Sequence, residues 1–276
     1  MGLGVKLPNA FSINKLGLEG TPFPLGVSCN QSDTGVFSMY LYPQRLVDMF
    51  DLLHGFEMCI VFGVGHKLSN PNHPQHTLNL AEIVDSVAID CTVVDANTIA
   101  ISTGELMRLL SILPQHDLCM FDMPRNSSQD DVITNMLNYD EVKLRKNRSQ
   151  LPHLTNSSVF LNSHDDCYLT LESYDTGLLQ QVFERALQTY VGTFLLGKLG
   201  VDEIEVREVP FGLLNILWPK NAHLTILPEE TEITESEVKI GVSRQQFDLR
   251  VQQALQVDIV ISYNCATQIW NPTKPQ

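Results

Sequence analysis

Three of the chain's eight histidines, His66, His73 and His76, lie within the stretch "VFGVGHKLSNPNHPQHTLNL", residues 61–80. Imidazole nitrogens are common ligands of Zn²⁺ and similar divalent ions, so these residues could form a metal site if the loop folds back on itself. The stretch lacks the helical His-Glu-x-x-His pattern, and its prolines are typical of an exposed, turn-rich loop. We therefore expect a polar loop without a cofactor, and keep a divalent-ion site at the three histidines as the alternative.

Two further stretches contain residue types that could do chemistry. "FGVGHK" has two glycines before Lys67, but it lacks the third glycine and the helix of a dinucleotide-binding loop, and it lacks the Walker spacing. "NSHDDCYL" brings His164 and Cys167 close in sequence, although a nucleophile and its base usually come from distant segments. We expect neither a known nucleotide-binding loop nor a catalytic pair here, and interpret the second stretch as a hairpin turn.

A unit repeated four times would position these residues: a short strand that runs into an amphipathic helix. In each copy, alternating apolar residues give way to apolar residues three and four positions apart, which marks the change from strand to helix. The copies read "VFSMYLYPQRLVDMFDLL", "TIAISTGELMRLLSIL", "CYLTLESYDTGLLQQVFERAL" and "EVKIGVSRQQFDLRVQQAL". We expect the helices to begin at Pro43, Thr103, Asp175 with Thr176, and Ser243, which are residue types that favour helix N-termini.

Turn residues between β-branched runs predict hairpins at residues 95–97 and 162–166. Further strands are expected in "FEMCIVFGV", "DEIEVREV", "AHLTIL" and "DIVISYNCATQIW". Because strands outnumber helices and often follow one another, the sequence predicts an α+β fold. We expect mixed or largely antiparallel sheets with about four amphipathic helices.

A polar stretch rich in Asn and Ser, "DMPRNSSQDDVITNMLNYDEVKLRKNRSQLPHLTNSS", separates the second unit from the third. Its composition is typical of a surface excursion or a link. We place a domain boundary near residue 150, between an N-terminal α+β half (1–150) and a C-terminal α+β half (151–276). One continuous domain is the alternative, and pseudo-duplication of the two halves is a hypothesis.

The charge of the chain argues against two classes of partner. It has 18 Lys and Arg against 32 Asp and Glu, a formal net charge of -14 and a pI near 4.9. Nucleic-acid and anionic-lipid binding both need clustered positive charge, so we expect neither nucleic acid nor membrane as a partner. The N-terminus shows no secretory signal, and six single cysteines without Cys-x-x-Cys are typical of reduced thiols in a core. These features predict a cytoplasmic protein.

Two apolar segments and one acidic segment predict surfaces. "GLLQQVFERALQTYVGTFLLGKLG" is apolar all round, so this helix should be buried within the chain or against another subunit. "LPEETEITESEVKIG" predicts a solvated strand face or loop, with a negative surface for a basic partner as the alternative. "VPFGLLNILWPK" concentrates large apolar side chains between two prolines, and its expected interface anchors are Phe211, Leu214, Leu217 and Trp218.

No constellation of residues in the sequence identifies a reaction. Four strand-into-helix units are also the outline of a sliding clamp, but clamp helices need surplus positive charge, and the charges of these four helices balance. The sequence therefore favours a non-catalytic structural or scaffold protein that acts through protein–protein surfaces. We expect self-association or another protein as the partner. The alternative is an enzyme of unrecognised type that depends on a metal at the His66, His73 and His76 loop.

Overall fold

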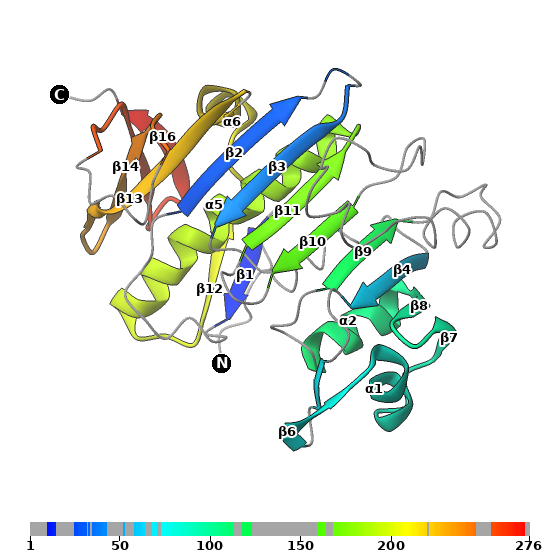
Figure 1. Cartoon of the computed structure of the whole chain (residues 1–276). Coiled ribbons are helices and arrows are strands. Elements are labelled where there is room, and N and C mark those ends of the chain that lie inside the picture. Colours follow the sequence, from blue (N-terminus) through cyan, green and yellow to red (C-terminus); the bar gives the residue numbers. More distant parts are fainter. Residues whose placement is uncertain are drawn as a thin grey trace. The chain divides into compact units, whose positions relative to one another are not determined.

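The computed structural model places antiparallel strands and four helices among the residues that it describes (Figure 1). The chain divides into two compact units. Unit 1 comprises Met1–Asn30, Leu41–Pro43 and Gln180–Gln276, and unit 2 comprises Gln31–Tyr40 and Gln44–Leu179. The described residues are 10–14, 25–31, 33, 35–42, 52, 58–63, 68–70, 73–112, 118–122, 159–163, 168–219, 221–246 and 255–273.

The predicted α+β class is confirmed by these elements. Pseudo-duplication of two halves stays a prediction, and the expected boundary near residue 150 lies outside the described residues. No helix in the described part of the chain is both long and apolar enough to cross a membrane.

Unit 1 contains an antiparallel sheet with the strand order β16-β15-β14-β13-β2. A separate ribbon pairs β1 with β12. The strands are β1 (Ala10–Asn14), β2 (Leu25–Gln31), β12 (Glu203–Arg207), β13 (Ala222–Ile233), β14 (Glu237–Ser243), β15 (Ile259–Asn264) and β16 (Ile269–Thr273). The helices are α5 (Thr176–Leu199), of which the first residues belong to unit 2, and α6 (Phe211–Leu217).

Unit 2 contains strands in the order β3-β11-β10-β9-β4-β8-β7, and β5 pairs separately with β6. The strands are β3 (Phe37–Tyr42), β4 (Met58–Gly63), β5 (Leu68–Asn70), β6 (His73–Leu78), β7 (Cys91–Asp95), β8 (Thr98–Ser102), β9 (Leu118–Asp122), β10 (Val159–Ser163) and β11 (Tyr168–Ser173). The helices are α1 (Leu80–Ser86) and α2 (Thr103–Ile112).

Helix α5 begins where the sequence predicts it. The Asp175 carboxylate oxygen Oδ1 accepts hydrogen bonds from the backbone N–H groups of Gly177 (2.8 Å) and Leu178 (3.2 Å), which are N–H groups without a partner inside the helix. The helix ends before Gly200, whose φ of 65° favours glycine. Its apolar residues are buried within the chain, which confirms the first of the two expectations; they include Leu179, Val182, Phe183, Ala186, Leu187, Val191 and Leu195.

The other predicted helix starts have different outcomes. Helix α2 begins at Thr103, as expected. Ser243 instead ends strand β14, and its hydroxyl accepts the N–H of Gln245 at 3.2 Å, so this residue closes a turn rather than capping a helix. The prediction of a helix start at Ser243 is therefore wrong, while residues 247–254 and the expected helix at Pro43 lie outside the described residues.

Both predicted hairpins are confirmed. Strands β7 and β8 pair around residues 96–97, where Asp95 Oδ1 accepts the N–H of Asn97 at 2.8 Å. Strands β10 and β11 pair antiparallel on either side of residues 164–167. Helix α1 is an element that the sequence analysis missed. A reciprocal capping box begins it, because the side chain of Asn79 accepts the N–H of Glu82 and the side chain of Glu82 accepts the N–H of Asn79, each at 2.9 Å.

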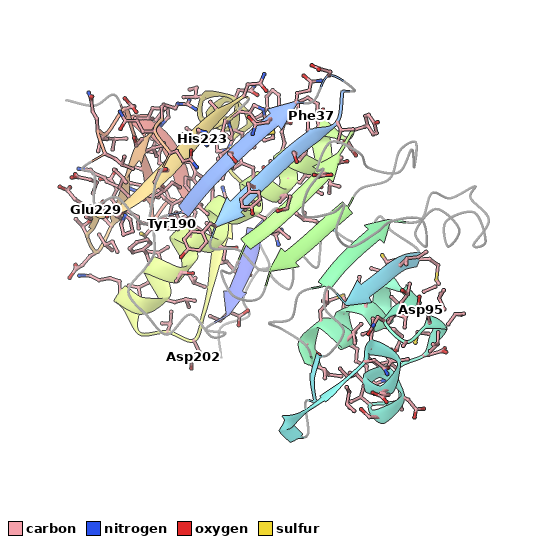
Figure 2. The ribbon with its side chains drawn as sticks, in the orientation of Figure 1. Phe37, Asp95, Tyr190, Asp202, His223 and Glu229 are labelled. Carbon is pink, nitrogen blue, oxygen red and sulfur yellow. The ribbon has the colours of Figure 1, made fainter. Side chains whose placement is uncertain are left out.

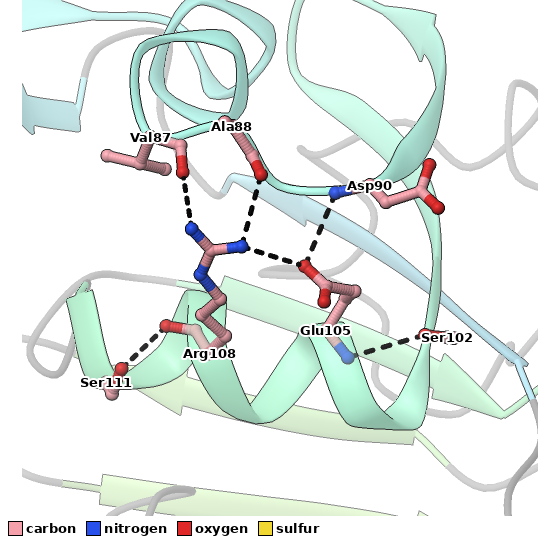
Figure 3. A network of polar contacts seen from close by, with 7 residues as sticks. All are labelled: Val87, Ala88, Asp90, Ser102, Glu105, Arg108 and Ser111. Carbon is pink, nitrogen blue, oxygen red and sulfur yellow. Dashed lines mark hydrogen bonds and ion pairs between the residues drawn. The ribbon is translucent and has the colours of Figure 1, made fainter.

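A guanidinium group joins helices α1 and α2 (Figure 3). Arg108 on α2 donates hydrogen bonds to the backbone oxygens of Val87 (2.9 Å) and Ala88 (3.1 Å), at the end of α1. Glu105 lies one turn earlier, forms an ion pair with Arg108 at 3.5 Å, and accepts the N–H of Asp90 at 3.3 Å. This network holds the turn that leads from α1 into β7.

The acidic segment forms the outer part of β13 and its connection to β14. Glu229, Glu230, Glu232 and Glu235 are exposed, which confirms the predicted solvated strand face. Glu229, labelled in Figure 2, projects away from the sheet. The pairing of β13 with β14 shifts between Leu227 and Thr231, so residues 228–230 bulge out of the ladder.

Candidate protein-interaction surface

Two segments of the histidine stretch, Leu68–Asn70 and His73–Leu78, form strands rather than the loop that the sequence predicts. His73 and His76 lie on β6, and β6 pairs with β5, with Asn70 opposite His73. His66 lies outside the described residues. Among the residues that the structure describes, no group of three or more His, Cys, Asp and Glu side chains could hold a metal ion. The divalent-ion site stays a prediction.

The other chemically suggestive stretches also lie mainly outside the described residues. Lys67, His164 and Cys167 all lie outside the described residues. Four cysteines whose side chains the structure describes are thiols: Cys29 and Cys59 are buried, and Cys91 and Cys265 are partly exposed.

The apolar segment between the two prolines forms the short helix α6, which has a buried and an exposed face. Leu213, Leu214 and Leu217 are buried, with exposed fractions of 3%, 5% and 0%. Their spacing of one and four residues is that of one helix face. Two of the four expected interface anchors, Leu214 and Leu217, therefore belong to the core of this chain.

Trp218, the third expected anchor, is half-buried and packs inside the chain. Its indole ring contacts the ring of Phe183 on α5 edge-on, with centroids 5.7 Å apart and an interplanar angle of 71°. This geometry is a favourable one for two aromatic rings. The contact helps to hold α6 against α5.

Phe211, the fourth expected anchor, lies on the opposite face and is 67% exposed. Gly212, Asn215 and Ile216 share this face, and Ile216 is 48% exposed. We call these four residues the α6 surface. An outward helix face is ordinarily polar, so a Phe and an Ile here are large apolar side chains that the fold leaves in water.

Hydrogen bonds hold both ends of α6 in place. At the start, the backbone N–H of Val209 donates to the Glu184 carboxylate of α5 at 2.6 Å. At the end, the Arg244 guanidinium donates to the carbonyl oxygens of Ile216, Leu217 (3.3 Å) and Trp218 (3.5 Å). A cation at a helix C-terminus satisfies carbonyls that have no partner inside the helix and interacts favourably with the helix dipole. Phe211 therefore lies on a helix that is held at both ends.

Two carboxylates lie at the N-terminal end of the α6 surface. Glu208, exposed, precedes Pro210, and Glu184 is half-buried beside it. Burial raises the pKa of Glu184 above its ordinary value of 4.5, and the charge of Glu208 raises it further. The hydrogen bond from Val209 and the nearby Arg185 act in the opposite direction and are the smaller effects in sum. The two acids therefore repel each other.

Comparisons with known proteins identify no family for this chain. No protein-family model, no curated protein and no solved structure matches it.

The α6 surface offers apolar contact area to solvent. An exposed aromatic ring and an aliphatic side chain on a rigid helix supply the contact area that anchors protein interfaces. The sequence pointed to this segment by its apolar content, but it did not separate Phe211 from the buried leucines. Apolar residues at positions 211, 213, 214, 216 and 217 together go round a helix, so no spacing in this segment signals which face is buried.

Proposed function

We propose that this chain is a non-catalytic building block that acts through protein–protein contacts, as part of an oligomer or a larger assembly, and that the α6 surface is one of its contact sites. The observation that carries the proposal is Phe211, exposed at 67% on a helix held at both ends. Burying a Phe side chain contributes about 1.5–3 kcal/mol relative to leaving it in water. A partner that covers Phe211 and Ile216 would recover this free energy.

A cytoplasmic location belongs to the same proposal. The buried thiols of Cys29 and Cys59 support it, because buried free cysteine behaves as a small apolar side chain in a reducing compartment.

Photo-cross-linking from the helix tests the proposal. Benzoylphenylalanine would replace Phe211 in one variant and Tyr174, another exposed aromatic residue, in a matched control. We expect irradiation in cells that contain the natural partners to give discrete high-mass adducts from position 211 and none of the same mass from position 174. The same adducts from both positions, or none from position 211, would contradict a contact site on α6.

A further inference from the structure

We infer that Arg207 and Tyr263 form a binding site for a small carboxylate, in which the Arg207 guanidinium and the Tyr263 hydroxyl donate hydrogen bonds to the carboxylate oxygens. The site uses none of the residues of the α6 surface, so the inference goes beyond the proposed function and does not depend on it. The observation that carries it is a guanidinium without an acceptor among the described residues.

The Arg207 side chain lacks a partner in the described part of the chain. Its Nε atom is buried and has no hydrogen-bond partner there. The hydrogen bonds between Arg207 and other described residues use its backbone, which donates to the Tyr263 hydroxyl and accepts from the Trp270 indole. The ion pairs between described residues involve Arg108 and Lys239 instead. Leaving a buried donor without an acceptor is costly, and such a group indicates a water, an ion or a ligand.

The other arginines among the described residues are engaged. Arg108 and Arg244 donate to backbone carbonyls, and Arg185 donates its Nε–H to Gln188 at 3.2 Å. The chain has 32 Asp and Glu against 18 Lys and Arg. Arg207 is therefore an exception in an acidic protein, because none of the described carboxylates pairs with it. An acceptor from outside the chain would satisfy the guanidinium.

The Tyr263 hydroxyl supplies a second donor at the same place. Its oxygen accepts the Arg207 N–H at 3.4 Å, and its own hydrogen has no acceptor among the described residues. Burial raises the pKa of Tyr263, while the hydrogen bond from the Arg207 N–H and the positive charge of Arg207 act in the opposite direction. The charge of the guanidinium therefore acts on this hydroxyl. Because the pKa is raised, the hydroxyl stays protonated at neutral pH and remains a donor.

The fold holds both donors in place. Tyr263 on β15 is 1% exposed, and its ring contacts the ring of Trp270 with centroids 4.9 Å apart. Arg207 ends β12, opposite Ala10 of β1, and is partly exposed. The guanidinium thus lies at the boundary between the interior and solvent. Donors that are fixed before binding lose little conformational entropy when a ligand arrives.

The charge of the site favours a carboxylate over a phosphate. The planar guanidinium matches the two oxygens of a carboxylate, and one positive charge then faces one negative charge. A phosphate group carries about 1.5 to 2 negative charges at pH 7. The protein has a formal net charge of -14, so the additional charge is unfavourable. The ligand should also be small, because Tyr263 and the Arg207 Nε atom are buried.

Titration with sodium acetate, followed by ¹H–¹⁵N NMR, tests the inference. The reporters are the Nε–H of Arg207 and the indole N–H of Trp270, which donates to the Arg207 carbonyl. The chain has two tryptophans, so the indole N–H of Trp218 is an internal control, and Trp270→Phe assigns the two resonances. We expect the reporters to shift and saturate with a Kd of about 1–10 mM, since so small a ligand makes few contacts. Sodium chloride at the same ionic strength should give no saturable shift.

Matched variants locate the binding. Arg207→Gln keeps most of the side chain but removes the charge, and should weaken acetate binding by at least about tenfold. Tyr263→Phe removes only the hydroxyl and should weaken it several-fold. Lys198→Gln removes an exposed positive charge from the same unit and should leave binding unchanged. Thermal melting verifies the folding of each variant, and the wild-type titration remains decisive if Arg207→Gln does not fold.

Three results would overturn the inference. Shifts that stay linear up to about 0.3 M acetate and equal those in chloride would show that water alone satisfies the guanidinium. Inorganic phosphate that binds as tightly as acetate, at the same ionic strength, would contradict the choice of a carboxylate. Unchanged acetate binding in Arg207→Gln would place the ligand elsewhere. The cross-link at position 211 tests the proposed function separately, because none of these results depends on the α6 surface.

Discussion

The indole N–H of Trp270 donates a hydrogen bond to the backbone oxygen of Arg207 over 3.1 Å, which joins strand β16 to strand β12. The backbone N–H of the same Arg207 points to the hydroxyl oxygen of Tyr263 at 3.4 Å. The two aromatic rings contact each other with centroids 4.9 Å apart. The last residue of β12 is therefore held by both of its backbone groups, directly before the connection to α6 begins.

Trp270→Phe should destabilise this junction. The substitution removes the indole N–H and leaves the part-buried carbonyl of Arg207 without this donor, which costs about 1–3 kcal/mol. Urea unfolding would measure the loss. Tyr263→Phe is the comparison, and because its hydrogen bond is longer we expect a smaller loss. Equal free energies of unfolding for wild type and Trp270→Phe would contradict the role given to this contact.

Gly241→Ala should destabilise the β13–β14 pair. A Cβ at position 241 would lie 2.6 Å from Glu230 Cβ and 3.2 Å from both the Glu230 backbone oxygen and Val257 Cγ2, so the bulge would have to move. Overpacking of this kind costs about 1–3 kcal/mol. Gly197→Ala on α5 is the matched control, since its Cβ meets open space and alanine favours a helix. The midpoint temperature of thermal unfolding should therefore be lower for Gly241→Ala than for the wild type. For Gly197→Ala it should be equal to that of the wild type or higher.

Arg244→Ala should loosen the C-terminal end of α6. The guanidinium satisfies three carbonyls there, and its loss should cost about 1–2 kcal/mol. Arg244→Lys keeps the charge without the planar set of donors, so we expect it to restore only part of the stability. Hydrogen exchange of the α6 amides, followed by mass spectrometry, would show faster exchange in the alanine variant. Unchanged exchange would show that the leucine face alone holds the helix.

Arg108→Ala should destabilise unit 2 locally. The side chain is about half exposed (49%), so solvent weakens its ion pair with Glu105, and most of the effect should come from the lost hydrogen bonds to Val87 and Ala88. We expect a loss of about 1 kcal/mol or less in urea unfolding. Glu105→Gln removes the charge but keeps an acceptor for Asp90, and should cost less. A larger loss of unfolding free energy in Glu105→Gln than in Arg108→Ala would contradict the view that the hydrogen bonds to Val87 and Ala88 supply most of the effect.

The raised pKa of Glu184 predicts how the stability of the protein changes with pH. Its pKa in the folded protein is raised above the ordinary value of 4.5 by burial, so between these two values the folded state binds more protons than the unfolded state. Stability therefore falls as pH rises through that interval, and the loss persists at neutral pH. Glu184→Gln keeps an acceptor for the Val209 N–H without the charge. We expect the wild type to gain stability relative to Glu184→Gln as pH is lowered from neutral towards 4.5, measured by urea midpoints. A constant difference across this range would contradict the raised pKa.

Local signals in the sequence determined several elements of this protein. Asp175 predicts the start of α5, and the turn at residues 95–97 predicts a hairpin, because each signal acts through hydrogen bonds within a few residues. The capping box of Asn79 and Glu82 was equally visible and would have predicted α1. Ser243 shows the limit of such signals, since a hydroxyl that can cap a helix also closes the turn after a strand.

The tertiary structure alone decided which apolar residues face the core and which face solvent. The segment from Phe211 to Trp218 is apolar almost throughout, so its composition predicts burial but not the rotation of the helix. That rotation follows from contacts with distant residues: Glu184 and Phe183 on α5 and Arg244 after β14. The sequence by itself determined that this segment is apolar and that the chain is acidic. Only packing against residues far away in the sequence left Phe211 outside, because these contacts form in three dimensions and have no sequence period.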